Sequence, residues 1–378
     1  MADRESELPA RIAPGVASID PAQWDRLAGG DPFLGWSFLG SLEDSGSLGP
    51  GTGWNPAPIL VGDNHQIAAA APAYVKGHSQ GEYVFDHGWA EAWHRAGGQY
   101  YPKLQIAVPF TPVPGPRLLG VRPQLLLESI ESVTVSNQLS SAHITFIDGA
   151  GAAECERRGW LIRHGIQYHW FNRDYESFDN FLGVLASRRR KDIRKERTRA
   201  LDGLEFQALR GDEIGPAEWD SVWAFYQDTG ARKWGQPYLT RRFFDLIASR
   251  MGEKLLLFLA SRDGVAIAGA LNIIGTDTLY GRYWGATEEV PFLHFELCYY
   301  QAIDWAIRHG LKRVEAGAQG EHKLARGYEP VITRSAHYLP NPGFRAAVDD
   351  FVTREREAID REMAWLQVGL PYRSSSSA

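Results

Sequence analysis

The sequence is poor in cysteine and has no long apolar run, and both absences narrow the possible classes of protein. Two of its 378 residues are cysteines, Cys155 and Cys298. A disulfide framework is therefore excluded, and a reducing cytosol is the expected compartment. No run of about 18 uncharged apolar residues occurs, and the charged N-terminus lacks the apolar stretch of a secretory signal. We expect a cytoplasmic protein with no membrane span.

An excess of basic charge is also missing. The chain has 40 Lys and Arg residues against 46 Asp and Glu residues, a formal net charge of −6 at pH 7, which disfavours a general nucleic-acid binder. The sequence lacks the Walker A motif, a G-x-G-x-x-G turn that opens a helix, the C-x-x-C and H-E-x-x-H metal motifs, and the G-x-S-x-G elbow. We expect no metal and no resident cofactor.

What the sequence does have is a globular composition. Apolar residues make up 44% of it and charged residues 23%, which excludes a mainly disordered chain. At about 150 residues per domain, the length allows two or three domains. We expect a flexible leader over residues 1–19, domains over 20–175 and 176–370, and a disordered tail over 371–378.

The two halves of the chain show the same order of expected elements. Each half runs helix, Ser/Thr-Gly stop, strand, Asp-containing turn, Ala-rich strand, aromatic strand and helix. In the first half these segments are Trp36–Glu43, Pro58–Val61, Ile67–Val75, Glu82–Asp86 and Ala90–Ala96. In the second half they are Trp219–Asp228, Lys254–Ala260, Ala266–Ile274, Leu279–Trp284 and Phe295–Arg308. The repeated order predicts a duplicated α/β fold with mixed sheets; ordinary α/β punctuation is the alternative. A last helix is expected over Ala346–Val368.

The densest group of polar residues follows a predicted strand, at residues 315–328. Its polar members are Glu315, Gln319, Glu321, His322, Lys323, Arg326 and Tyr328. Glycines between them let backbone N–H groups approach a ligand. His322 can accept a proton near neutral pH, and Lys323 and Arg326 can hold a phosphate or an oxyanion. The segment is predicted to be an active site, with a polar surface loop as the alternative.

A second cluster places Arg282 among aromatic residues on a predicted strand, beside Tyr283 and Trp284. A buried arginine needs an anionic partner. Glu296 or a ligand would supply it. A structural ion pair beside an aromatic core is the alternative.

A third cluster combines Asp86 and Lys103 with the proline-rich stretch Pro109–Arg117. Proline fixes the backbone, so this stretch suits the rigid wall of a cleft. Asp86 and Lys103 are the candidate polar residues of that wall. A purely structural loop is the alternative.

A basic run over residues 188–199 interrupts the otherwise acidic chain. Asp192 and Glu196 lie four residues apart among opposite charges, which favours a helix. Its lysines and arginines could grip a phosphodiester backbone, with a solvated helix face as the alternative. The residues concerned are Arg188, Arg189, Arg190, Lys191, Arg194 and Lys195.

Seven long motifs resemble those of the FemAB-like predicted N-acyltransferases of bacteria, which are related to GNAT enzymes and to peptidoglycan biosynthesis. They are Ser41–Ser47, Gly81–Asp86, Tyr100–Leu104, Pro109–Pro112, Leu279–Gly285, Leu293–Gln301 and Gly317–Tyr328. The resemblance covers about residues 30–350. It implies two tandem GNAT-like domains of the Fem type, with a C-terminal helix.

The resemblance also implies an acyltransferase that forms an amide bond. Better-known Fem relatives move an amino acid from aminoacyl-tRNA to an amine, and the basic run resembles their tRNA-binding helix. GNAT enzymes that use acetyl-CoA carry a Q/R-x-x-G-x-G/A loop, whereas the matching segment here, Gly285–His294, lacks those glycines and contains Glu288 and Glu289. We expect aminoacyl-tRNA as donor and a small-molecule or peptide amine as acceptor. A CoA-dependent N-acyltransferase and a non-catalytic module that binds RNA or a partner are the alternatives.

Acyl transfer to an amine requires a proton acceptor and a group that stabilises the carbonyl oxygen. We expect His322 or Glu296 to accept the proton. Lys323, Arg326 and Arg282 would bind the donor phosphate and the oxyanion. Residues expected to line the acyl pocket or bind substrate are Tyr283, Trp284, Asp86, Lys103, Gln319, Glu321 and Tyr328.

Overall fold

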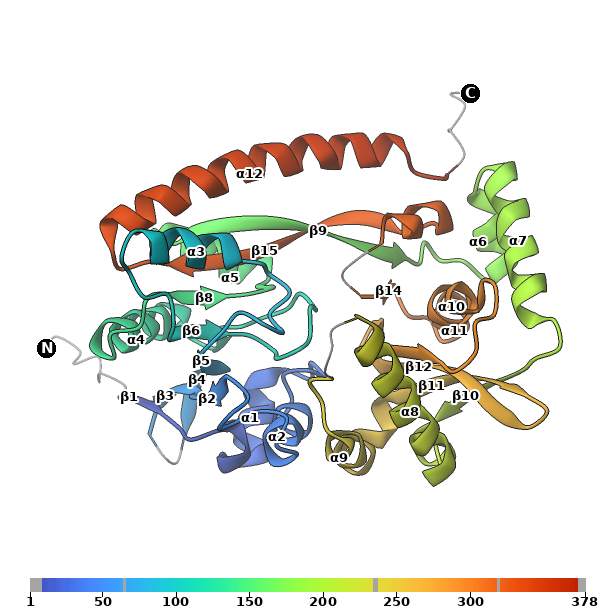
Figure 1. The fold of residues 1–378 in the computed structure, drawn as a ribbon, viewed down its shortest axis with the longest axis horizontal. Helices are drawn as coiled ribbons and strands as arrows, with labels where there is room; N and C mark the ends of the chain where they lie inside the picture. The colour runs from blue at the N-terminus through green and yellow to red at the C-terminus, as the bar shows by residue number, and fades with distance from the viewer. Residues whose placement is uncertain (1–8, 64–65, 234–236, 318–319, 373–378) are drawn as a thin grey trace, which may run out of the picture. The chain divides into compact units, whose positions relative to one another are not determined.

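The computed structural model describes four stretches of the chain, drawn as a ribbon in Figure 1. They are residues 9–63, 66–233, 237–317 and 320–372. The chain divides into two compact units. Unit 1 is made of Met1–Gly165 and Ile332–Asp360, and unit 2 of Ile166–Val331 and Arg361–Ala378.

Two neighbouring strands and one helix pass from one unit into the other. They are β9 (Leu161–Phe171), β15 (Glu329–Tyr338) and α12 (Pro342–Val368). The larger sheet has the order β10-β11-β12-β13-β14-β9-β15-β8-β6-β5-β2, so the two shared strands are adjacent in it. Because β15 pairs with β8 (Ala142–Ile144), residues 332–360 belong to unit 1. The observed division therefore differs from the predicted one, which kept 176–370 together.

Parts of the predicted leader and tail are ordered elements of the fold. Ala10–Ile12 form β1, which pairs antiparallel with β3 (Ile59–Gly62). Near the other end, the Tyr372 hydroxyl donates to the Gly327 carbonyl at 2.7 Å. Residues 1–8 of the predicted leader and 373–378 of the predicted tail lie outside the described residues.

Unit 1 contains the smaller sheet, β1-β3-β4-β7, and the β2 end of the larger one. Its other strands are β2 (Trp54–Pro56), β4 (Ile67–Ala71), β5 (Ala73–Lys76), β6 (Lys103–Ile106) and β7 (Leu119–Gly120). Its helices are α1 (Pro21–Ala28), α2 (Trp36–Asp44), α3 (His87–Arg95), α4 (Pro123–Ser136) and α5 (Gly149–Arg157). Apolar residues of α4 recur at helical spacing, so Leu126, Leu127 and Ile130 face the core with Ala69 and Ala71 of β4.

Pro72 divides the predicted strand Ile67–Val75 into two strands that join different sheets. β4 pairs with β3 and β7, whereas β5 pairs with β2 and β6. Proline has no N–H to donate to a ladder, so a strand is interrupted there. The Pro72 carbonyl still accepts a hydrogen bond from the Ala107 N–H at 3.1 Å.

The aromatic strand predicted over Glu82–Asp86 is wrong. These residues belong to a loop between β5 and α3, and Tyr83 has a positive φ of 58°. The carboxylates of Glu82 and Asp86 both accept hydrogen bonds from the Lys103 ammonium group. The segment is therefore held in place by these side-chain hydrogen bonds and not by backbone hydrogen bonds to a neighbouring strand.

Unit 2 contains the β10 end of the larger sheet, and most of its predicted elements are confirmed. Its strands are β10 (Glu205–Arg210), β11 (Leu255–Arg262), β12 (Val265–Ile274), β13 (Thr278–Ala286) and β14 (Arg313–Glu315). Its helices are α6 (Phe178–Val184), α7 (Ser187–Leu201), α8 (Pro216–Lys233), α9 (Arg241–Met251), α10 (Leu293–Phe295) and α11 (Gln301–Arg308). Gly285 of β13 lies against α8, because a Cβ there would be 2.2 Å from the Phe225 carbonyl oxygen.

The helix predicted over Phe295–Arg308 contains an irregular turn. Glu296–Tyr300 form a π-helical turn between α10 and α11. Such turns insert one residue into the helical ladder and are frequent at functional sites. This turn lies on the face of unit 2 that carries the polar segment after β14.

Candidate active site

The candidate site begins where two parallel strands of unit 2 separate. Thr278–Tyr280 of β13 pair with Arg313–Glu315 of β14. Beyond these residues β13 continues to Ala286, while the chain leaves β14 for a 3-10 helix, η5 (Glu321–Arg326). The carboxyl ends of parallel strands that diverge are a common location for ligands.

A β-bulge places Arg282 at this point of β13. Leu271 is opposite Tyr283 and Asn272 is opposite Gly281, so Arg282 is the extra residue. Bulges redirect a side chain and often occur beside active sites. The Arg282 guanidinium carbon lies 5.6 Å from the centre of the Tyr283 ring.

The two aromatic residues predicted to line an acyl pocket have different surroundings. The Tyr283 ring packs edge-on against Phe244 and Tyr226, at centroid distances of 5.5 and 5.7 Å. The Trp284 ring packs against His294 of α10 at 5.2 Å. Trp284 is therefore the one of the two beside the polar segment.

His322 lies at the exposed edge of an aromatic group formed by the π turn and α10. Its Nε2 is 2.9 Å from the Tyr299 hydroxyl oxygen, and its ring lies 5.4 Å from that of Phe295 and 6.4 Å from that of His294. Partial burial, Arg326 and Lys323 all lower the pKa of His322. The imidazole is therefore neutral near pH 7 and can accept a proton.

Lys323 is buried next to His322. Its side chain belongs to a residue that is 1% exposed, and its ammonium group donates to the Gly317 carbonyl at 2.7 Å. Burial lowers the pKa of Lys323 to about 8, although the neighbouring Cys298 acts in the opposite direction. Lysines with such a pKa change charge close to physiological pH, as groups in active sites often do.

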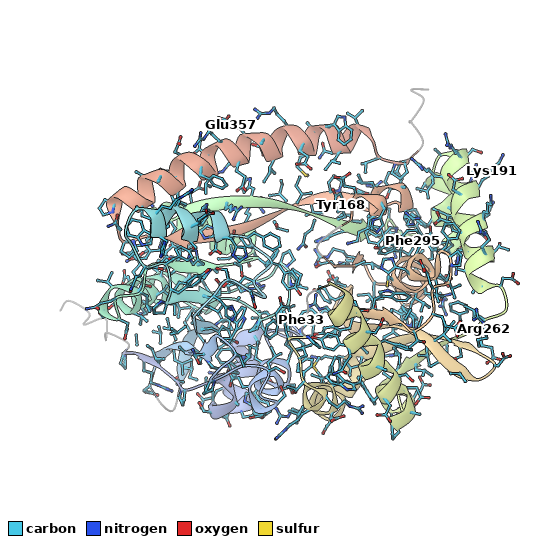
Figure 2. The ribbon with its side chains drawn as sticks, in the orientation of Figure 1. Phe33, Tyr168, Lys191, Arg262, Phe295 and Glu357 are labelled. Carbon is cyan, nitrogen blue, oxygen red and sulfur yellow. The ribbon has the colours of Figure 1, made fainter. Side chains whose placement is uncertain are left out.

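Arg326 is held in one orientation by three contacts. Its Nη2 donates to both carboxylate oxygens of Glu196 at 2.9 Å, and its Nη1 donates to the His322 carbonyl at 2.8 Å. The guanidinium carbon lies 3.5 Å from the centre of the Phe295 ring, whose place in the fold is labelled in Figure 2. The buried Nε of Arg326 has no hydrogen-bond partner among the described residues. That N–H is a buried donor whose hydrogen bond is unfilled in the described part of the chain.

Glu296 is held by two donors of its own. Arg197 contacts its carboxylate through Nε at 3.1 and 3.2 Å and through Nη2 at 2.9 Å, and Gln301 donates to it at 2.8 Å. Burial raises the pKa of Glu296, while Arg197 and Gln301 lower it in part. The structure therefore pairs Glu296 with Arg197, and the role of Glu296 or His322 as proton acceptor stays a prediction.

The remaining residues predicted in the segment have different positions. Glu321 is exposed to solvent. Tyr328 is fully buried against the Tyr299 ring, at 5.5 Å, and its hydroxyl has no hydrogen-bond partner in the described part of the chain. Gln319 lies outside the described residues. Glu315 ends β14 with its carboxylate 3.1 Å from the Arg313 Nε.

The basic run forms α7, and its predicted RNA-binding residues lie mostly on one surface. Arg188, Arg189, Lys191, Arg194 and Lys195 are exposed. Arg190 is half-buried and donates to the Gly183 carbonyl at 3.3 Å. Lys191, labelled in Figure 2, marks this outer face of α7. The opposite face carries Glu196 and Arg197, which sequence reasoning missed as site residues.

Asp86 and Lys103 form a separate polar cluster inside unit 1. The Lys103 ammonium group contacts Asp86 and lies 2.8 Å from both Glu82 Oε2 and Ser79 Oγ. The side chains of Lys103 and Asp86 are 0% and 3% exposed. The Tyr100 hydroxyl donates to Asp86 at 2.6 Å. Burial at this depth makes the cluster part of the interior of unit 1, and substrate binding by it stays a prediction.

Metal and membrane motifs are not evident in the described structure. Across residues 9–372, apart from the gaps noted above, no three His, Cys, Asp or Glu side chains are arranged to hold a metal ion. In the same stretches no helix has the length and apolar character needed to cross a bilayer.

Comparison with models of protein families shows the family to which this chain belongs. The FemAB_like family model, described as peptidoglycan biosynthesis/recognition, matches residues 15–374. The chain belongs to this FemAB-like family. A search of curated proteins finds no match.

Solved structures agree with this affiliation at the level of the fold. FemX has 14% sequence identity and a TM-score of 0.54, covering 88% of this chain and 98% of its own. A conserved protein of unknown function from Bacteroides thetaiotaomicron has 12% identity and a TM-score of 0.51, covering 88% and 99%. L-PGS from Bacillus licheniformis has 10% identity and a TM-score of 0.50, covering 83% and 95%. The predicted Fem-type fold of two GNAT-like halves with a C-terminal helix is confirmed.

Proposed function

We propose that this FemAB-like protein is an acyltransferase that forms an amide bond by moving an aminoacyl group from aminoacyl-tRNA to an amine. The observation that carries the proposal is the arrangement of three side chains beside the diverging strands of unit 2. A neutral His322, a buried Lys323 and an Arg326 with an uncommitted Nε lie within one short helix. Together they provide a proton acceptor and two cationic donors.

In the proposed reaction, His322 receives the proton that the acceptor amine loses as its nitrogen attacks the ester carbonyl carbon. The tautomer in which Nε2–H donates to the Tyr299 oxygen leaves Nδ1 as the proton acceptor. Lys323 and the Arg326 Nε stabilise the negative charge on the carbonyl oxygen. The C–N bond forms, the ester C–O bond breaks, and the leaving 3′ oxygen of the tRNA takes up the proton that His322 received. No covalent enzyme intermediate is required.

Two observations favour a tRNA donor over CoA. The exposed basic face of α7 suits a phosphodiester backbone. The segment after β13, where GNAT enzymes that use acetyl-CoA bind pyrophosphate, carries two acids. Glu288 there forms an ion pair with Arg262, and Glu289 is exposed. Two carboxylates repel a pyrophosphate. We propose that the protein acts in the cytosol, where aminoacyl-tRNA is present.

The test is a donor screen with purified protein, a mixture of amines, and either charged tRNA pools or acyl-CoAs. Amide products are identified by mass spectrometry, and His322→Asn is run in parallel. We expect product from charged tRNA, lowered by about 10²- to 10⁴-fold in His322→Asn, as for loss of a general base. Product from acyl-CoA alone would show a CoA-dependent N-acyltransferase. RNA binding without product from any donor would show a binding module.

A further inference from the structure

We propose that Glu196 is a positioning residue that couples the RNA-facing surface of α7 to Arg326. This inference rests on the proposed function for its kinetic consequence, although its structural part can be tested without turnover. Glu196 has an unusual place on α7. Asp192, one turn earlier, is exposed, whereas the Glu196 side chain is only 18% exposed and faces the site.

The contacts of Glu196 show that it holds the side chain of Arg326. Both its carboxylate oxygens accept hydrogen bonds from Arg326 Nη2 at 2.9 Å, and the Tyr300 hydroxyl also donates to it. Arg326 is 130 residues further along the chain. Since Nη1 is fixed by a backbone carbonyl and the guanidinium lies on Phe295, Glu196 completes the set of contacts that aims the uncommitted Nε. Charge-assisted contacts of this kind are directional and strong.

A second clamp fixes the rotation of α7 about its axis. Arg197, the next residue, binds the buried Glu296 of the π turn, and its guanidinium carbon lies 4.4 Å from the Phe178 ring centre. On α7, Glu196 therefore faces Arg326 and Arg197 faces Glu296. A change in the rotation of the helix would bring residues of like charge together. Movement of α7 must therefore move Glu196 and with it Arg326.

The opposite face of the same helix is the basic one. Lys191, Arg194 and Lys195 are exposed there within two turns of Glu196, and Arg188 is exposed eight residues before it. A phosphodiester backbone bound to this face would restrain the helix that holds Arg326. The donor that supplies the acyl group would in this way also order the group that stabilises the oxyanion.

The direct test measures the reaction of Arg326 with phenylglyoxal, read by peptide mass spectrometry. Glu196→Gln keeps the shape of the side chain and removes its charge. We expect Arg326 to react about tenfold faster in this variant than in the wild type, as expected when a charge-assisted hydrogen bond is lost. Asp192→Asn, which removes the same charge from the exposed face, should leave the rate unchanged. Tyr300→Phe serves as a second variant and should give a smaller increase.

Coupling is tested by adding an RNA hairpin that lacks the acylated 3′ end. It should slow the labelling of Arg326 in the wild type, but not in Glu196→Gln or in Lys191→Glu/Lys195→Glu, with hairpin binding checked by fluorescence anisotropy. Slowing that persists in Glu196→Gln would show direct shielding and overturn the coupling. Equal labelling of wild type and Glu196→Gln would overturn the positioning role.

The proposal also predicts that substitution of Glu196 changes kcat, whereas substitution of the exposed lysines of α7 changes KM. With charged tRNA, Glu196→Gln should lower kcat by about tenfold or more at an unchanged KM, because misplacing a catalytic group affects the chemical step. Lys191→Glu/Lys195→Glu should raise KM. A rise in KM in Glu196→Gln would contradict the assignment. If no donor gives product, the proposed function fails, whereas the labelling result still decides the role of Glu196.

Discussion

The two units each bury a network of charged side chains, and the networks differ in chemistry. Unit 1 uses lysines: Lys103 and Lys76 face Glu82 and Asp86, and all four side chains are at most 3% exposed. Unit 2 uses arginines: Arg326 and Arg197 face Glu196 and Glu296, and three of these four side chains keep between 8% and 20% exposure.

The two networks also differ in the segments of the chain that they join. In unit 1 the lysines of two strands hold the loop that follows β5, and the Lys76 ammonium also lies 3.6 Å from the Trp54 ring centre. In unit 2 the pairs join α7 to segments 99 and 130 residues away. The first network stabilises an irregular loop, and the second fixes the geometry of a candidate site. On our proposal, burial of a charge therefore has a structural use in unit 1 and a positioning use in unit 2.

The pKa directions of the buried lysines differ within unit 1 as well as between the units, because burial lowers the pKa of Lys76 to about 7. Burial alone would lower the pKa of Lys103, but Glu82 and Asp86 outweigh it and raise that pKa. The Lys103 charge is thus retained at every physiological pH. Among the described residues, Lys323 in unit 2 has no carboxylate partner of this kind, and burial lowers its pKa to about 8.

The largest effect on stability is expected from Lys103→Met. Removing this ammonium group leaves Glu82 and Asp86 buried with their main partner lost, at a cost of about 3–5 kcal/mol in the free energy of unfolding. Chemical denaturation followed by circular dichroism measures it. Lys191→Met, at an exposed lysine, is the matched control and should stay within about 0.5 kcal/mol of the wild type. A loss below 1 kcal/mol for Lys103→Met would mean that the loop is held by other contacts.

A smaller loss of stability is expected from Arg197→Ala. It leaves the buried Glu296 with Gln301 as its remaining donor, which should cost about 2–3 kcal/mol by the same measurement. Because a protonated Glu296 no longer requires the arginine, the deficit should shrink at acidic pH. A deficit that is constant from pH 7 to pH 4 would show that Arg197 acts through packing on Phe178 instead.

The pH dependence of turnover should depend on the protonation states of His322 and Lys323 in unit 2. His322 must be neutral to accept a proton, so kcat/KM should rise with pH through a pKa below 6.5. Lys323 must be charged to stabilise the oxyanion, so kcat/KM should fall above about pH 8. Each limb should approach a tenfold change per pH unit. Lys323→Arg keeps its charge and should remove the alkaline limb; an unchanged limb would assign it to another group.

The smallest effect is expected at the exposed ion pair of α7. Arg194 and Asp179 are 2.9 Å apart, with side chains 59% and 79% exposed. Breaking such a pair by Arg194→Ala should change the free energy of unfolding by less than about 1 kcal/mol. The same variant should weaken RNA binding and reduce its salt dependence. Stability lost to the extent seen in Arg197→Ala would remove the distinction between the two faces of the helix.

Most elements of unit 2 could be predicted from the sequence because their apolar spacing is regular. Val265–Ile274 and Ser187–Leu201 lie close to the predicted ranges, since each is defined by its own pattern of residues. The segment Glu82–Asp86 has aromatic and apolar residues at its centre but forms no strand, because its carboxylates are bound by a lysine 17 and 21 residues away. Local patterns do not contain such partners.

The candidate site was predictable in part for the same reason. His322, Lys323 and Arg326 are close in sequence, and the 3-10 helix keeps them close in space. The pairing of Arg326 with Glu196 spans 130 residues, and the alternation of charge along the helix explains Glu196 equally well as a surface residue. Its role depends on which face of the helix is covered, and a single sequence does not determine that.

Because β9 and β15 each contribute residues to both units, the chain cannot be cut into two fragments that each contain one unit alone. A fragment that stops at Gly165 lacks Ile332–Asp360, and with it the strand that borders β8. Residues 1–165 alone therefore form an incomplete unit 1, whereas residues 166–378 contain all of unit 2 together with the missing segment of unit 1. When the chain is expressed as two fragments cut at this point, the N-terminal fragment should regain its native structure only when mixed with the other, which supplies the strand it lacks.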